Sequence, residues 1–211
     1  MSSSNEPRTR DAERSKTVIL EAATQLFAQK GFDATGIGEI AQLAGVARGT
    51  PAYFFGSKEA LFEEVVSQLN QRAFSIVPTA LGRAGENPNS DKLIEVFIDT
   101  YLEFHAANPE FLRVIHWISL TENRLMTQAV THWNSLATML SAVMMTLKDT
   151  PLEREDPRQM VLTIIGMCNA HLTYGVTIAE PLGLHTIDPG FLEARKTHLK
   201  HLLIATLRGS S

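Results

Sequence analysis

The spacing of apolar residues over the first third of the chain predicts a series of helices. Over residues 11–30 they recur at i, i+4 and i+8, which places them on one face of an amphipathic helix. Two shorter helices are predicted over about 37–44 and 48–54. Each helix is followed by a glycine, and Gly31 suits the left-handed conformation that often follows a last helical turn.

A fourth helix is predicted to begin after Ser57, whose hydroxyl can cap it, and to reach about residue 76, where Pro78 stops it. Residues 78–90 are rich in Pro, Gly and Asn and are predicted to be a linker. Longer helical patterns follow, and Asp188 is predicted to be the N-cap of the last. These patterns lie near residues 91–107, 109–119, 122–148, 157–179 and 189–208.

The chain therefore reads as all-α, because no segment alternates apolar and polar residues as a half-buried strand would. We expect an N-terminal three-helix head joined to a C-terminal helical bundle. The expected boundaries are a disordered basic arm over residues 1–10, the head over 11–56 and the bundle over 57–211.

Composition and charge fit a globular protein with a sizeable core, since 44% of the residues are hydrophobic and 20% are charged. A net charge of −4 does not by itself indicate a nucleic-acid partner, but a whole-chain sum hides local patches. The N-terminus lacks the apolar core of a signal peptide, and no apolar run reaches the roughly 18–20 residues that span a membrane. The single cysteine, Cys168, excludes an internal disulfide, so we expect a cytoplasmic protein.

The segment IAQLAGV, residues 40–46, has the parts of a helix-turn-helix, in which two short helices meet at a tight glycine turn. Ala41 is small where the helices would cross, Gly45 makes the turn, and Ile40 and Val46 are predicted to face the core. The next helix would then enter a DNA major groove, which accepts an α-helix and exposes base edges.

That next helix, within GVARGTPAYFFGSKEAL at residues 45–61, suits close approach to DNA better than it suits helix stability. Gly49 has no side chain to block the duplex. With Ala47 as the N-cap, Pro51 is the fourth helical residue and forfeits only the first hydrogen bond of the helix.

Arg48 is the expected base reader, because a guanidinium matches guanine O6 and N7. Thr50 and Tyr53 offer hydroxyls to phosphate or base, and Lys58 lies at a helix N-terminus, which favours phosphate. Thr35 is a candidate for the DNA contact, for a turn or cap, or for both.

Four basic residues crowd before the first helix, and two interpretations stay open for them: a solvated helix start, or an arm that meets phosphate. They are Arg8, Arg10, Arg14 and Lys16. Phe54 and Phe55 are expected to pack in the core or at a hinge rather than stack on bases.

Residues 19–65 resemble the TetR family of transcriptional regulators. The motifs that match are an "AA..LF...G" helix, then "T...IA..AGV", then "GT..Y.F.SKE.L", with matching spacing over about 47 residues. The resemblance implies a dimer that binds a palindromic operator and a C-terminal domain that binds a small-molecule inducer. It places the DNA contacts at Arg48, Gly49, Thr50, Tyr53 and Lys58.

The chain departs from the family pattern at several head positions. Pro51–Ala52 replaces a Leu–Tyr pair, so the tyrosine that contacts phosphate in the family is absent, and Tyr53 is expected to replace it in part. Gly36 and Gly38 stand where polar residues are common. Each lost helix cap costs about 1 kcal/mol. We interpret these changes as altered phosphate contacts and operator choice.

The last two helices are the expected dimer surface, by the family resemblance and by composition. Small residues in MVLTIIGMCNAHLTYGV permit close packing, and leucines form a stripe on the final helix. Burial within one subunit is the open alternative. The candidate interface residues are Gly166, Ala170, Leu199, Leu202 and Leu203.

Candidate residues for an inducer pocket lie on the middle helices, although aromatics and methionines at helical spacing are more often simple core. A hydrophobic or aromatic small molecule would fit them. The candidates are Phe104, His105, Trp117, Met126, Trp133, Met144 and Tyr174.

No cofactor or metal site is expected, and we do not expect an enzyme, because no His-Glu-x-x-His, P-loop or Gly-x-Ser-x-Gly motif occurs. Cys168 is expected to be a buried small residue rather than a redox sensor. His198 and His201 lie one turn apart, but no third ligand is suggested. Three alternatives stay open: an architectural DNA-binding protein without an inducer, a helical receptor that does not bind DNA and an all-α enzyme.

Overall fold

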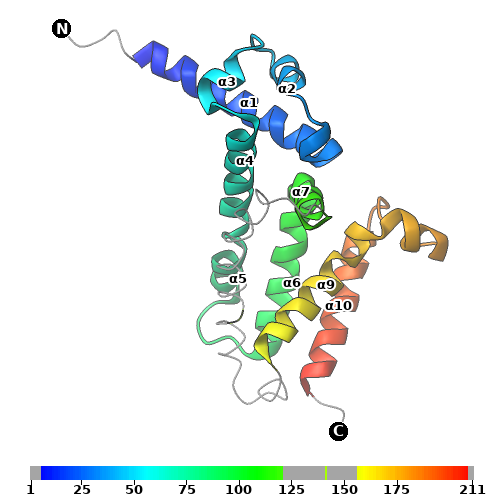
Figure 1. Cartoon of the computed structure of the whole chain (residues 1–211). Helices are drawn as coiled ribbons and strands as arrows, with labels where there is room; N and C mark the ends of the chain where they lie inside the picture. The colour runs from blue at the N-terminus through cyan, green and yellow to red at the C-terminus, as the bar shows by residue number, and fades with distance from the viewer. Residues whose placement is uncertain (1–5, 121–140, 142–155, 209–211) are drawn as a thin grey trace. The chain divides into compact units, whose positions relative to one another are not determined.

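The computed structural model describes residues 6–120, 141 and 156–208, and in this part of the chain the regular elements are helices without strands (Figure 1). The all-α fold class is therefore confirmed. The helix predicted over 122–148 lies outside the described residues, except for Ser141.

The helices have the following bounds. The N-terminal part contains α1 (Glu6–Ala34), α2 (Ile37–Leu43), α3 (Thr50–Phe55) and α4 (Lys58–Ala73). These are followed by α5 (Ile76–Ala84), α6 (Ser90–Ala107) and α7 (Pro109–Leu120). The last described part contains α9 (Pro157–Thr173), the π-helix η2 (Gly175–Ala179), the 3-10 helix η3 (Glu180–Leu182) and α10 (Phe191–Arg208).

The described residues fall into two compact units. The first contains residues 6–71 and α7, and the second contains residues 72–108, 141 and 156–208. The first unit is thus assembled from two separate parts of the sequence. The boundary predicted from the sequence lies between residues 56 and 57, whereas the division between these units falls after residue 71.

The core of the first unit is built on α1, whose apolar stripe is buried as predicted. Phe27 of α1 meets Phe62 of α4 edge-on at a centroid distance of 5.0 Å, and Phe32 meets the same ring at 5.2 Å. α7 packs along α1, where Trp117 donates its indole N–H to the carbonyl oxygen of Ala28 at 3.3 Å.

Gly31 interrupts α1 with φ 78° and ψ 177°, so its positive φ is as predicted. A Cβ atom at this position would lie 2.9 Å from the Trp117 ring. Glycine is therefore required here twice, once by the backbone conformation and once by the close approach of the indole.

In the second unit, α6 runs antiparallel to α10, and three ion pairs mark their register. Asp91 pairs with Arg208, Asp99 with Lys200 and Glu103 with Lys196, at N–O distances of 2.6, 2.6 and 3.3 Å. Arg83 of α5 also meets Glu103, at 2.7 Å. Its hydrogen bond, together with Lys196, holds the pKa of the Glu103 carboxyl below its usual range.

Several predictions about the ends of helices are wrong. Residues 78–84 of the predicted linker belong to α5, and Pro78 is its third residue, where the backbone N–H would have no helical partner anyway. Asp188 is not the N-cap of α10, because the helix starts at Phe191 and Ala194 donates its backbone N–H to Gly190 at 3.0 Å. Residues 6–10, expected to be disordered, form the start of α1.

Within the described residues, no single helix is both long and apolar enough to cross a membrane. A pair consisting of Arg158–Thr173 and Gly175–Leu182 meets the requirement in length and composition, but it is bent by 73°.

Candidate nucleic-acid interface

The turn between α2 and α3 has the geometry of a helix-turn-helix. Gly45 takes φ 66°, and Val46 returns its backbone N–H to the carbonyl of Ala41 at 3.0 Å. Ile40 and Ala41 are fully buried, as predicted, and Val46 is half-buried. The turn is therefore built from buried α2 residues and one glycine.

The start of α2 is capped by an acidic residue, although Gly36 has no side chain for the purpose. Glu39 accepts the backbone N–H of Gly36 at 3.1 Å and pairs with Lys30 of α1 at 2.6 Å. The hydrogen bond from Lys30 is the main cause that lowers the pKa of Glu39, so the carboxylate stays ionised. Glu39 thus supplies part of the capping that the sequence at Gly36 lacks.

The helix α3 begins at Thr50, with Gly49 as its N-cap, two residues later than predicted. Pro51 is consequently the second residue of the helix rather than the fourth and interrupts no helical hydrogen bond. Pro51 is also the buried residue of α3, while its neighbour Ala52 is exposed. The proline therefore anchors the helix to the core.

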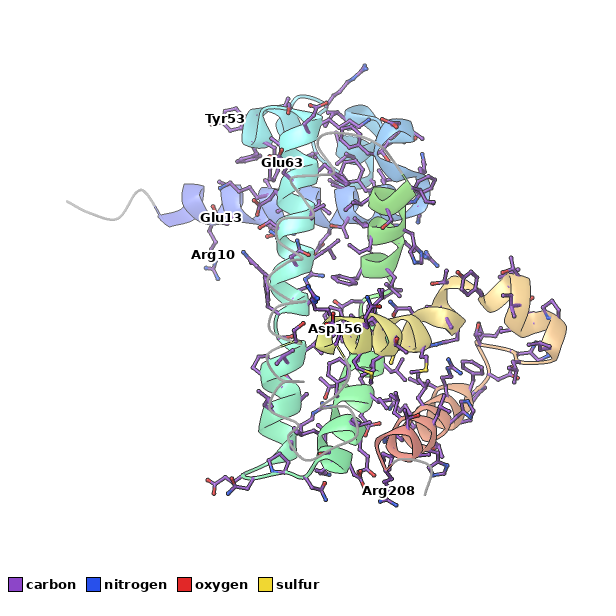
Figure 2. All side chains as sticks on the ribbon, turned by 60° about the horizontal axis from the view of Figure 1, so that its bottom comes forward. Arg10, Glu13, Tyr53, Glu63, Asp156 and Arg208 are labelled. Carbon is purple, nitrogen blue, oxygen red and sulfur yellow. The ribbon has the colours of Figure 1, made fainter. Side chains whose placement is uncertain are left out.

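The exposed face of this region combines a cation, an open backbone and an aromatic hydroxyl. Arg48 is exposed in the turn before α3, and its Nε lies 3.6 Å from where a Cβ on Gly38 would stand. Nothing lies within 4 Å of a Cβ built on Gly49. Tyr53 is 82% exposed and projects away from the ribbon (Figure 2). Thr50 is half-buried at the first position of α3.

Lys58 has partners within the first unit. Its Nζ donates to the carbonyl of Asp33 at 3.3 Å and lies 4.4 Å from the centre of the Phe32 ring. Ser57 caps α4 as predicted, by accepting the backbone N–H of Ala60 at 3.1 Å. Lys58 therefore supports the packing of α4 on the end of α1 in addition to its expected role at phosphate.

Thr35 does not offer its side chain to DNA, so that prediction is wrong. The residue is 1% exposed, and its hydroxyl is 2.7 Å from the carbonyl oxygen of Gly31 and 3.3 Å from that of Leu26. The hydroxyl therefore serves the turn after Gly31, which is the alternative that the sequence left open.

We expect Thr35→Val to lower the free energy of unfolding by about 1 kcal/mol, because the buried hydrogen bond is lost. The salt dependence of DNA affinity should stay unchanged, since no phosphate contact is removed. Chemical denaturation and DNA titration at several salt concentrations measure the two quantities. Thr35→Ser, which keeps the hydroxyl, is the control. A flatter salt dependence of DNA affinity for Thr35→Val would show that the Thr35 side chain does contact phosphate.

Four of the candidate pocket residues lie in the described part of the chain, and they belong to different units. Trp117 belongs to the first unit and lies against Gly31, whereas Phe104, His105 and Tyr174 belong to the second. His105 is buried, with ring centroids 4.4 Å from Tyr101 and 5.3 Å from Phe104. The remaining three candidates lie outside the described residues: Met126, Trp133 and Met144.

His105 belongs to a buried polar cluster between α6 and α9. Burial and the nearby His171 lower the pKa of His105 to about 4. Tyr101 donates its hydroxyl to Asn169 Oδ1 at 3.0 Å. Cys168 is fully buried, and burial raises the pKa of its thiol to about 12, which is unsuited to a redox sensor.

The candidate dimer residues divide into two groups. Leu199 and Leu203 are buried within their own chain, at 1% and 4% exposed, so those two predictions are wrong. Leu202 is 45% exposed, Gly166 is exposed, and Ala170 is half-buried. Sequence reasoning missed a larger set of exposed apolar residues after α9, although that stretch is nearly free of charges. They are Val176, Ile178, Leu182, Leu184 and Ile187.

Over the described residues, no group of three or more His, Cys, Asp or Glu side chains could hold a metal ion. His198 lines a cleft at the start of α10, and His201 is exposed.

Comparison with known proteins agrees with this geometry. Residues 19–65 match the family described as "Bacterial regulatory proteins, tetR family". The chain is 26% identical to the HTH-type transcriptional regulator RutR of Escherichia coli O157:H7, over 95% of this chain and 94% of RutR. It is 33% identical to the HTH-type transcriptional repressor SCO4008 of Streptomyces coelicolor, over 51% of each protein.

The fold is also found in a solved structure, that of the fatty acid degradation regulator FadR of Bacillus halodurans. The TM-score is 0.70 at 19% identity, covering 93% of this chain and 97% of FadR. These relatives and structural neighbours are transcriptional regulators rather than enzymes. The helix-turn-helix geometry of α2 and α3 and the match at residues 19–65 agree, and the fold is shared along most of the chain: residues 19–65 are the helix-turn-helix domain of the tetR family of bacterial regulatory proteins.

Proposed function

We propose that this regulator represses transcription by binding a palindromic operator as a dimer and that a small molecule releases it. The observation that carries the proposal is the exposed face before and along α3, with Arg48, the open backbone at Gly49 and the projecting Tyr53. A repressor needs no further partner, because occupying a promoter is sufficient.

The residues of this face have separate roles. Arg48 reads a guanine, since its guanidinium can donate to O6 and N7 in the major groove. Tyr53 and Thr50 donate hydroxyl groups to phosphates. Lys58 adds positive charge near the start of α4. The phosphate contacts set the position of the head on DNA, and Arg48 sets sequence preference.

A dimer would place two such heads on successive major grooves, which is how helix-turn-helix proteins read palindromes. Exposed apolar side chains on α9 and α10 support this assembly: Leu162 is 68% exposed, Leu172 is 43% and Leu202 is 45%. Exposed apolar side chains on helices are ordinary one at a time, and several on the two helices expected to pair are compatible with an interface.

The inducer is a hydrophobic or aromatic small molecule that binds the helical C-terminal part, and the protein acts in the cytoplasm beside its DNA. The main alternative is an architectural protein that uses the same head without an inducer. Release from DNA by a small molecule distinguishes the two.

Arg48→Ala should reduce the preference for the operator over random DNA by about 1–3 kcal/mol, because one bidentate base contact is lost. Lys58→Ala should weaken binding to both DNAs alike and flatten the salt slope. Titrations of both DNAs at several salt concentrations measure these effects. Because Lys58 also packs on Phe32, the stability of its variant is measured in parallel. If both variants weaken binding to operator and random DNA equally, Arg48 does not read a base and the two residues do not have separate roles.

The test of the whole proposal is selection of genomic fragments with the purified protein, followed by footprinting at two salt concentrations. A short protected palindrome is the expected result. Binding without a preferred site would favour the architectural alternative, and no binding at all would overturn the proposal.

A further inference from the structure

Residues 174–190, between α9 and α10, form an ordered projection that we name the apolar arm. Its backbone is internally bonded: Tyr174 O accepts from the N–H groups of Ile178 and Ala179 at 2.9 and 3.1 Å, and Ala179 O accepts from Leu184 at 2.9 Å. The returning limb contacts the outgoing one, since the side chain of Thr186 would lie 3.3 Å from a Cβ on Gly175. The arm extends beyond the ends of α9 and α10 (Figure 1).

The arm exposes an unusual amount of apolar surface for an ordered segment. Ile187 is 91% exposed, Val176 is 74% and Leu182 is 70%. Glu180 is the one acidic or basic (Asp, Glu, Lys or Arg) residue between positions 174 and 187. Apolar patches that are depleted of charge are typical of the core of a protein interface.

A cleft of about 450 Å³ opens at the base of the arm. Its walls come from the end of α9, the inner side of the arm and the start of α10, and include Tyr174, Leu184, Phe191 and Ala194. Ile187 and Val176 are not among its lining residues. Each chain therefore carries an apolar cleft and, on the same segment, apolar side chains directed elsewhere.

We propose that the occupant of this cleft is the apolar arm of a second copy of the chain, with Ile187 as the inserted side chain. The inference rests on the proposed dimer and assigns it a reciprocal contact. A two-fold interface must be self-complementary, and a cleft and a projecting side chain on one segment meet that requirement. Exposed apolar side chains are also present on the two adjoining helices, Leu172 on α9 and Leu202 on α10.

A small molecule is a poorer occupant, because it would fill the cleft and leave Ile187 in water. The arm is also preorganised by its internal hydrogen bonds, so little conformational entropy is lost when it inserts. One inserted apolar side chain in a well-packed cleft has the properties of an interface hot spot.

The first experiment measures the dimer dissociation constant of the full chain by sedimentation equilibrium. Ile187→Glu should raise this constant by at least about thirtyfold, because a hot-spot side chain is replaced by a charge. Leu81→Glu is the matched control, since Leu81 is 44% exposed on α5 of the same unit. The control should dimerise as the wild type does. Circular dichroism should show native folding for both variants, because both positions are exposed.

The second experiment tests reciprocity. Ala194→Phe fills the cleft and should weaken the homodimer as Ile187→Glu does. A mixture of the two variants retains one intact arm-and-cleft pair in each heterodimer, so heterodimers should exceed both homodimers in native mass spectrometry. A loss of dimer by Ile187→Glu without this rescue would overturn the insertion into the cleft.

The outcomes separate this inference from the proposed function. A monomeric wild-type protein at all concentrations would overturn the proposed dimer itself. A dimeric wild type with an equally dimeric Ile187→Glu variant would overturn the apolar arm alone. Such a result would leave the cleft to a small molecule.

Discussion

Replacing Gly31 by alanine is expected to lower the free energy of unfolding by about 2–6 kcal/mol. The φ of 78° with ψ of 177° is a conformation that residues with a Cβ rarely adopt, which costs roughly 1–3 kcal/mol. The added Cβ would stand 2.9 Å from the Trp117 ring, and such overpacking costs about a further 1–3 kcal/mol. Urea denaturation measures the loss.

Two further variants identify the cause of this loss. Gly38→Ala adds a Cβ inside α2 of the same unit, 3.6 Å from Arg48 Nε, and should be neutral or stabilise the protein by about 0.5–1 kcal/mol. Adding Trp117→Leu to Gly31→Ala removes the crowded ring, so the combined loss should be smaller than the sum of the single losses. An additive pair would mean that the ring does not contribute.

Acidification from pH 7 to pH 4 is expected to lower the stability by about 3 kcal/mol through His105 alone. Burial lowers the pKa of His105 to about 4 in the folded chain, from an ordinary value of 6.5. The unfolded chain therefore binds a proton at a higher pH than the folded chain does. The stability contributed by neutral His105 is present above pH 6.5 and is lost as the pH falls toward 4.

The measurement is the free energy of unfolding in urea at intervals between pH 4 and pH 7.5. His105→Leu should flatten the slope in this range, because the titrating group is removed. Some slope should remain, since burial also lowers the pKa of His171. The carboxyl of Glu103 titrates lower, and its loss of stability follows at more acidic pH. A slope that is unchanged in His105→Leu would exclude His105 as the cause.

Local sequence signals predicted the head well. Ser57 caps α4 and Gly45 makes the turn because each acts on a backbone only a few residues away. Pro78 misled the prediction because a proline stops a helix only in its interior, and the sequence does not show how near it is to a helix start. For the same reason the sequence predicts that the last helix begins after Asp188, whereas α10 begins at Phe191.

The sequence was a poorer guide to side chains whose surroundings come from residues far away along the chain. The leucine stripe of α10 was visible, but the sequence could not tell that Leu199 and Leu203 face their own chain while Leu202 faces outward. Trp117 donates to Ala28, which lies 89 positions earlier in the chain. The sequence gives no sign of so distant a contact, and it therefore predicts a pocket role for this tryptophan instead. The buried hydroxyl of Thr35 donates to the carbonyl oxygens of Gly31 and Leu26, which the turn after Gly31 brings near it.

The packing of α7 on α1 also constrains how such regulators can be recombined. A chimera that takes its first 71 residues from one parent receives α7 from the other, and a foreign residue then faces the site where Trp117 covers Gly31. Operator specificity would transfer intact only when residues 109–120 travel with the head. A gene fusion that exchanges sensing domains should therefore take both the head and residues 109–120 from the same parent, which requires crossovers on each side of α7 as well as one after the head.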